Sequence, residues 1–219
     1  MEEKNVSLES AAKSDVSIEK NDKGQKKKMN LPNRLTILRI LLVPVYVMCV
    51  LYIKDPMVCG FISVMVFVAT GATDFLDGSI ARKHNLITNF GKFMDPVADK
   101  ILVFAAFLTL AVRVTALQSL LVWTSVIVFL RELMVTSLRL VCASSGGGVV
   151  AASFFGKAKT LVQDATISFV LLEYALIEGR ILDTMWIISY ILIAATIITT
   201  VGSGIDYLKS YGKFINPNE

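Results

Sequence analysis

Long apolar runs, separated by short polar segments, follow one another along the chain from about residue 30 onward. A bilayer core of about 30 Å is crossed by roughly 20 helical residues, and each run reaches that length together with its polar flanks. The pattern therefore predicts an all-α membrane protein with six transmembrane helices. We place these helices at 34–54, 57–82, 92–114, 118–142, 153–178 and 182–208.

The two ends of the chain differ from this pattern. Residues 1–28 carry many acids and lysines with almost no apolar side chain, so this segment cannot bury enough surface to offset its ordering entropy. We expect a disordered cytosolic tail at 1–28, a six-helix transmembrane domain at 29–210 and a cytosolic C-terminal tail at 211–219.

The composition agrees with a membrane protein. Of the 219 residues, 54% are hydrophobic and 18% are charged, and the mean hydropathy is +0.63, which is too apolar for an ordinary soluble domain. Cys49, Cys59 and Cys142 lie singly in apolar runs, and His84 is the one histidine. These counts disfavour a disulfide framework, a zinc site and a Ser-His-Asp triad.

The basic residues gather at alternate ends of the predicted helices. Because they do not form one patch, the net charge of +4 does not indicate a nucleic-acid-binding protein. The positive-inside rule places the ends rich in lysine and arginine in the cytosol, and an even number of helices puts both termini there. These ends carry Lys26, Lys27, Lys28, Arg34, Arg82, Lys83, Lys92, Arg139, Lys157, Lys159, Lys209 and Lys213.

Four aspartates interrupt the second and third apolar stretches. Asp74 and Asp77 are three residues apart and Asp95 and Asp99 are four apart, so each pair shares one helix face. A lone ionised aspartate in hydrocarbon costs about 2.5–3.5 kcal/mol, so four of them need compensation. Converging carboxylates take up protons or hold a cation, and all-oxygen ligands suit Mg²⁺ or Mn²⁺. The pattern favours a site for two such ions at the cytosolic end.

Other interpretations of this cluster remain open. The aspartates could cap helices or pair with Arg82, Lys92 and Lys100 at the interface. Carboxylates within a membrane also mark ion paths, which gives a divalent-cation transporter as an alternative. Clustering at one end beside Arg82, which would repel an entering cation and attract a phosphate, favours an enzyme. Gly78 and Ala81 would let a phosphate approach the backbone, although small residues also serve helix packing.

One extended pattern covers this region, D-x2-D-G-x2-A-R-x8-G-x3-D-x3-D from Asp74 to Asp99. It resembles the signature of the CDP-alcohol phosphatidyltransferase family. The similarity continues in NLPNRLTILRILLVP at 30–44, RELMVTSLR at 131–139 and FGKAKT at 155–160, which resemble the phosphatidylglycerophosphate synthase branch. The tail before Met29 shows no such likeness.

The resemblance implies the CDP-alcohol phosphatidyltransferase fold, a six-helix homodimer in the bacterial inner membrane with its active site facing the cytosol. The implied reaction transfers the phosphatidyl group of CDP-diacylglycerol to sn-glycerol 3-phosphate and releases CMP. Asp74, Asp77 and Asp95 would hold two divalent cations, Mg²⁺ or Mn²⁺. Asp99 would be both a further ligand and the base that accepts the proton of the attacking hydroxyl.

The resemblance also implies two substrate sites. The cytidine diphosphate site would include Asp74, Gly78, Ala81, Arg82, Asn33 and Thr36. The phosphate of the acceptor needs a cationic pocket, for which the candidates are Arg131, Arg139, Lys157, Lys159 and Arg39.

Several choices within these sites stay open. Lys157 and Lys159 are two apart on a helix, so we expect only one to face the pocket, and the alternative for both is snorkelling to the interface. Arg131 could instead pair internally with Glu132. Serine, inositol phosphate or phosphatidylglycerol are alternative acceptors.

Overall fold

The computed structural model describes residues 31–83, 89–144, 154–178 and 186–211. Within its helices, side chains are not described at 31–33, 74–83, 89–93, 95, 143–144, 154–155 and 157. The expected tails, 1–28 and nearly all of 211–219, therefore lie outside the described residues. In the part that is described, the long elements are α2 (Leu31–Tyr52), α3 (Pro56–Lys83), α4 (Asn89–Arg113), α5 (Gln118–Ser144), α6 (Phe154–Glu178) and α7 (Ile187–Tyr211).

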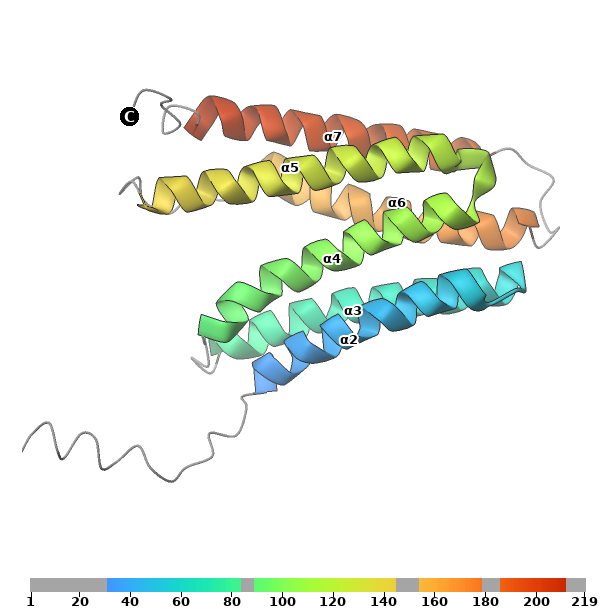
Figure 1. Ribbon diagram of the computed structural model, residues 1–219, viewed down its shortest axis with the longest axis horizontal. Coiled ribbons are helices and arrows are strands. Elements are labelled where there is room, and N and C mark those ends of the chain that lie inside the picture. The colour runs from blue at the N-terminus through green and yellow to red at the C-terminus, as the bar shows by residue number, and fades with distance from the viewer. Residues whose placement is uncertain (1–30, 84–88, 145–153, 179–185, 212–219) are drawn as a thin grey trace, which may run out of the picture. The chain divides into compact units, whose positions relative to one another are not determined.

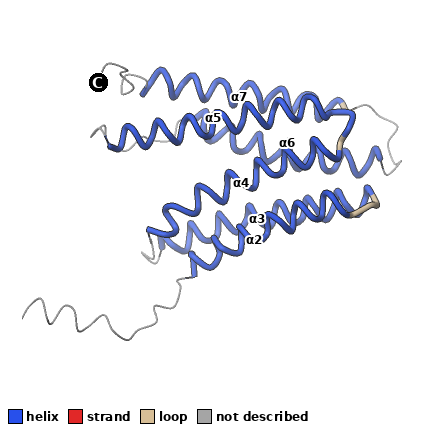
Figure 2. The backbone as a smooth tube through the Cα atoms, viewed as in Figure 1, coloured by secondary structure: helices blue, strands red, loops and turns tan. Residues whose placement is uncertain are grey.

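The prediction of an all-helical chain is confirmed for these residues, which contain no strand (Figure 2). A short 3₁₀ turn, η1 (Thr115–Leu117), joins α4 to α5 where we predicted only a gap. The backbone N–H of Leu117 donates to the carbonyl of Val114 at 3.1 Å, which closes this turn. The chain therefore reverses direction within three residues.

The observed helix ends differ from the predicted ones by a few residues, and side-chain caps account for two of them. The Asp55 carboxylate accepts from the backbone N–H of Val58 at 2.9 Å, so α3 begins directly after this cap. The prediction that the last helix spans 182–208 was wrong at both ends, because α7 begins at Ile187 and continues to Tyr211. Its first turn is capped from α6 by Glu173, which accepts from the backbone N–H of Ser189 at 3.0 Å.

Five of the helical segments are long and apolar enough to cross a membrane: Arg34–Tyr52, Pro56–Thr73, Thr115–Cys142, Ala158–Glu178 and Ile187–Tyr211. The exception among the long helices is α4, which carries Asp99 and Lys100 near its middle and Arg113 at its end. By length and composition alone, five of the six predicted helices thus qualify as membrane spans. The charges make α4 too polar to qualify by its sequence.

The position of α4 in the bundle explains how it tolerates these charges. It contacts α2, α3, α5 and α6, and it runs between the α2–α3 pair and the α5–α7 pair in Figure 1. Leu102, Ala106, Phe107 and Leu110 are buried on its inward face at helical spacing. Because so much of α4 packs against protein, its polar side chains can face a protein interior instead of lipid.

The helices alternate in direction, so each end of the bundle holds the starts of some helices and the ends of their neighbours (Figure 1). At one end, Arg113 at the close of α4 donates to the carbonyl of Ile53 at 2.5 Å and to the hydroxyl of Tyr174 at 2.8 Å. This clamp joins the α2–α3 turn to α6. The opposite end, where α4 and α6 begin and α5 and α7 finish, holds the candidate site.

Candidate functional site

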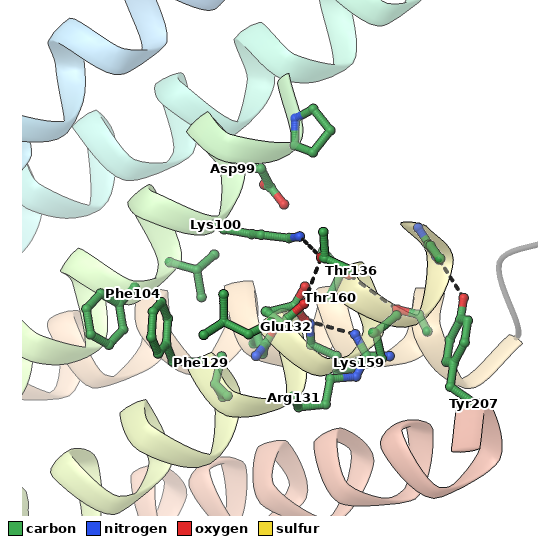
Figure 3. A pocket seen from close by; sticks show the side chains of 18 residues that line it. Asp99, Lys100, Phe104, Phe129, Arg131, Glu132, Thr136, Lys159, Thr160 and Tyr207 are labelled. Atoms are coloured by element: carbon green, nitrogen blue, oxygen red, sulfur yellow. Dashed lines mark hydrogen bonds and ion pairs between the residues drawn. The ribbon is translucent and has the colours of Figure 1, made fainter. Parts of the chain in front are cut away.

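A cavity of about 340 Å³ opens at this second end, between α4, α5, α6 and α7. Asp99 of α4, Arg131 and Arg139 of α5, and Lys159 of α6 all line it. Figure 3 shows Asp99 pointing from α4 toward the side chains of α5 and α6. The structure thus brings together four residues that the sequence analysis placed in the catalytic and acceptor sites.

The charges of the lining residues are unbalanced. Four cationic side chains, Lys100, Arg131, Arg139 and Lys159, face two carboxylates, Asp99 and Glu132, which gives a formal charge of +2. Thr136, Thr160 and Gln163 add neutral hydrogen-bonding groups, and the rest of the lining is largely apolar. In a partly dry cavity such an excess of positive charge suits a small anion with two negative charges.

Both arginines of α5 contact the same aromatic ring. The guanidinium carbon of Arg131 lies 5.5 Å from the ring centroid of Tyr207, and that of Arg139 lies 5.3 Å from it. Arg139 also donates through Nη2 to the Tyr207 hydroxyl at 2.5 Å. Tyr207, which is buried on α7, therefore orients two cations on the cavity wall.

Arg131 is also engaged on its other side. Its Nη1 donates to Oε1 of Glu132 at 2.9 Å, so the internal ion pair considered from the sequence is present. The same oxygen accepts from Nζ of Lys159 on α6. Glu132 thereby links two cations from different helices and holds them beside the cavity.

Lys159 is buried, with 5% of its surface exposed, so it does not snorkel to the interface. The side chain of Lys157 is not described. The structure therefore shows that Lys159 faces the pocket and leaves the orientation of Lys157 as a prediction.

Lys100, which the sequence suggested only as a partner for the aspartates, donates from Nζ to the hydroxyl of Thr136 on α5 (Figure 3). Lys100 therefore ties α4 to α5 across the cavity.

The other three aspartates are placed by their backbone only. Asp74 and Asp77 lie in the last turns of α3, and Asp95 lies in the first turns of α4 with Asp99 one turn further. Side chains that are described include no group of three or more His, Cys, Asp or Glu residues able to hold a metal ion. The side chains of Asp74, Asp77 and Asp95 are not among those described.

The expected nucleotide residues Gly78, Ala81, Arg82 and Asn33 likewise lie outside the described side chains. Thr36 and Arg39 are described, and both are buried on α2. Neither lines the cavity, so the structure does not join Arg39 to Arg131, Arg139 and Lys159. The physical reason is that α2 packs on α3 and α4, whereas the cavity lies on the other side of α4.

Sequence reasoning missed three residues of this cavity: Gln163, Tyr207 and Thr136. Gln163 follows Lys159 by one helical turn, so the shared face was a usable signal. Tyr207 is 68 residues from Arg139, and no local pattern relates the two. Only the packing of α7 on α5 brings that ring to the arginines.

Residues 29–202 match the family described as CDP-alcohol phosphatidyltransferase. The chain belongs to the CDP-alcohol phosphatidyltransferase family. The resemblance of the aspartate pattern to this family is therefore confirmed over most of the chain, and the tail before Met29 lies outside the match.

Curated relatives include members of this family from several bacteria. A CDP-diacylglycerol–glycerol-3-phosphate 3-phosphatidyltransferase of Bacillus subtilis is 36% identical over 195 residues, covering 82% of this chain and 94% of the relative. A probable phosphatidylglycerophosphate synthase of Mycobacterium tuberculosis is 35% identical over 186 residues, covering 84% and 83%. A Haemophilus influenzae CDP-diacylglycerol–glycerol-3-phosphate 3-phosphatidyltransferase is 34% identical over 184 residues, covering 83% and 93%.

Proposed function

We propose that this protein transfers the phosphatidyl group of CDP-diacylglycerol to sn-glycerol 3-phosphate, yielding phosphatidylglycerophosphate and CMP. The observation that carries the proposal is the cavity in which Asp99 faces four cationic side chains. The names of the relatives agree with this activity. Phosphatidylglycerophosphate is a phospholipid precursor, which makes the protein a transferase of phospholipid biosynthesis.

The charge and size of the cavity favour glycerol 3-phosphate over serine and phosphatidylglycerol as the acceptor. A formal charge of +2 suits the phosphate of glycerol 3-phosphate, whereas serine would leave this charge uncompensated. The volume of about 340 Å³ lies at the small end of ligand pockets, which run from roughly 300 to 1,000 Å³, and disfavours a second whole lipid such as phosphatidylglycerol. Inositol phosphate remains the nearest alternative on charge.

In this reaction, Arg131, Arg139 and Lys159 bind the phosphate of the acceptor. The primary hydroxyl of the acceptor then points toward Asp99. The Asp99 carboxylate accepts the hydroxyl proton as the oxygen attacks the phosphorus of the phosphatidyl group. The bond from that phosphorus to the CMP oxygen breaks, and CMP leaves with the bonding electrons. Fixing the acceptor in one orientation lowers the entropy cost of this bimolecular step.

The donor set at the α3–α4 end fits two divalent cations. Asp74 and Asp77 lie within the last turns of α3, Asp95 and Asp99 lie within the first turns of α4, and α3 contacts α4. Four carboxylates offer the hard oxygen ligands that Mg²⁺ and Mn²⁺ prefer. When bound, these ions would supply positive charge to the diphosphate of the donor.

The nucleotide would bind along the same end of α3. Asp74, Gly78, Ala81 and Arg82 follow one another over its last three turns, where small residues let a diphosphate approach and an arginine can donate two hydrogen bonds to it. Asn33 and Thr36 would border this site from the first turns of α2, which packs on α3. Lys157 stays proposed as a secondary cation for the acceptor phosphate, whereas Arg39 is left out of this role because it does not line the cavity.

The distribution of charged residues also suggests how the protein lies in the membrane. We place α4 across the bilayer as the sixth span, shielded by its neighbours, with the cavity and both termini on the cytosolic side. This position gives the cavity access to a soluble acceptor and to the headgroup of a membrane donor. We place the protein in the bacterial inner membrane as a homodimer.

The test is release of CMP by the purified protein in detergent with Mg²⁺ and CDP-diacylglycerol. Glycerol 3-phosphate, serine, inositol phosphate and phosphatidylglycerol are supplied one at a time, and we expect release only with glycerol 3-phosphate. Release with another acceptor alone would reassign the substrate. Metal flux into proteoliposomes without CMP release would replace the enzyme with a divalent-cation transporter.

A further inference from the structure

Gln163 on α6 is a buried polar residue with an unused hydrogen-bond donor. Its side chain is 2% exposed, and its Nε2 has no partner among the atoms of the protein. It lies on the wall of the cavity with Asp99 and Lys159. A buried donor without a partner destabilises a folded protein, so its retention calls for an explanation such as a ligand.

The neighbouring polar groups of α6 do not share this property. Lys159, one turn before Gln163, pairs with Glu132 on α5. Thr166, three residues after Gln163, donates to the carbonyl of Val162 at 2.7 Å and approaches the hydroxyl of Thr196 at 2.7 Å. The inward face of α6 is therefore satisfied within the protein on either side of Gln163, and the unused donor coincides with the cavity.

A second residue that lines the same cavity, Arg131, also has an unused donor. Nε of Arg131 is buried without a partner, although its Nη1 is engaged by Glu132. Two residues with unpartnered, buried N–H groups, one on α5 and one on α6, thus line a cavity that already has an excess of positive charge. Such a lining is built to receive a ligand rich in oxygen acceptors.

The chemistry of the two donors separates their roles. A guanidinium or ammonium group pairs with phosphate, whereas an uncharged carboxamide both donates and accepts, as an alcohol hydroxyl does. Gln163 lies one turn from Lys159, a rise of about 6 Å along α6, which is comparable to the length of a three-carbon alcohol phosphate. With the phosphate held near Lys159, a hydroxyl on the carbon chain comes within reach of Gln163.

We propose that Gln163 is a specificity-determining residue whose Nε2 donates a hydrogen bond to the secondary hydroxyl oxygen of the acceptor. This inference rests on the proposed transfer to sn-glycerol 3-phosphate, in which the primary hydroxyl reacts at Asp99 and the phosphate pairs with the cations. The secondary hydroxyl is the one polar group of that acceptor with no other assigned partner. Gln163 selects acceptors that carry it.

The experiment compares two acceptors on two proteins. The acceptors are sn-glycerol 3-phosphate and 3-hydroxypropyl phosphate, which keeps the phosphate and the primary hydroxyl but lacks the secondary one. We expect the wild-type kcat/KM to favour glycerol 3-phosphate by roughly tenfold, the value of one neutral hydrogen bond. The Gln163→Met variant, of nearly equal size, should treat the two acceptors alike, with an unchanged KM for CDP-diacylglycerol.

Two measurements separate this role from a structural one. The thermal midpoint of Gln163→Met without substrates should not fall, because the substitution removes an unsatisfied buried group. A lower midpoint with equal loss for both acceptors would assign Gln163 to folding and overturn the proposal. Gln118→Met, at an exposed position on α5 at the opposite end of the bundle, is the matched control and should retain the wild-type preference.

The outcomes also distinguish this inference from the proposed function. Wild-type protein that turns over both acceptors without preference refutes the role of Gln163 and leaves the transferase intact. A Gln163→Met variant that keeps the full preference refutes it equally. Wild-type protein that releases no CMP with either acceptor refutes the proposed function itself.

Discussion

Lys159 on α6 and Glu132 on α5 form an ion pair on the cavity wall, and the same carboxylate oxygen also accepts from Arg131 at 2.9 Å. All three side chains are largely buried, with 6%, 18% and 10% of their surfaces exposed. The two cations would repel one another in a site of low dielectric without the carboxylate between them. Glu132 therefore allows the two cations to lie close together, where both can bind one phosphate.

Removing this carboxylate should cost stability and acceptor affinity together. Glu132→Ala leaves Arg131 and Lys159 buried without their anion, and breaking such a pair costs about 3–5 kcal/mol. We expect a clear drop of the thermal midpoint in detergent and a higher KM for glycerol 3-phosphate. A midpoint equal to that of the wild type would show that the pair contributes nothing to the fold. Replacing all three residues by apolar side chains should restore the midpoint but not the activity.

Asp99 provides the sharpest test of the chemistry. Asp99→Asn keeps the size of the side chain but removes the group that accepts the proton, so CMP release should fall to background while the thermal midpoint stays close to that of the wild type. The matched control is Asp55→Asn at the opposite end of the bundle, where an amide oxygen can still cap α3. Full activity of Asp99→Asn would remove Asp99 from its role as base.

Tyr207 should act on the acceptor through Arg139. Tyr207→Phe keeps the ring beside both arginines but removes the hydroxyl that accepts from Arg139 at 2.5 Å. We expect the KM for glycerol 3-phosphate to rise several-fold, by about the value of one hydrogen bond, with little change in kcat or in the KM for the donor. Tyr190→Phe, at an exposed position on α7, should leave both KM values unchanged.

Arg139→Ala should raise the KM for glycerol 3-phosphate more than Tyr207→Phe does, because it removes the cation itself. Equal increases in the acceptor and donor KM values would argue against a separate acceptor pocket. A double variant is informative as well. If Tyr207 works by orienting Arg139, adding Tyr207→Phe to Arg139→Ala should have little further effect.

The packing of α3 on α6 depends on a glycine. A Cβ atom at Gly60 would lie 2.5 Å from Cβ of Ala175 and 2.6 Å from the carbonyl oxygen of Leu171, so the two helices would have to separate. Gly60→Ala should therefore destabilise the bundle by about 1–3 kcal/mol, measured as a lower thermal midpoint. Gly71→Ala on the same helix meets nothing within 4 Å and should be neutral or stabilising. Identical midpoints for the two variants would contradict this close approach.

Periodicity along the chain was sufficient to define the helices and the spacing of the aspartates. Hydrophobic runs of bilayer length and residues three or four apart are local properties, because a helix places them on one face whatever surrounds it. Helical periodicity also puts Arg131 and Arg139, which are eight residues apart, near one side of α5, and both line the cavity. It failed at the start of α7, where the cap comes from Glu173 on another helix.

What the sequence left open is how side chains meet between helices. Tyr207 reaches Arg139 across 68 residues, and Lys159 reaches Glu132 across 27, through contacts that depend on which helices pack together. The charge of the cavity and the unused donor of Gln163 likewise exist only once four helices enclose a common space. A local pattern specifies which way a side chain points from its own helix, whereas its partner is set by the burial of the remaining surface against neighbouring helices.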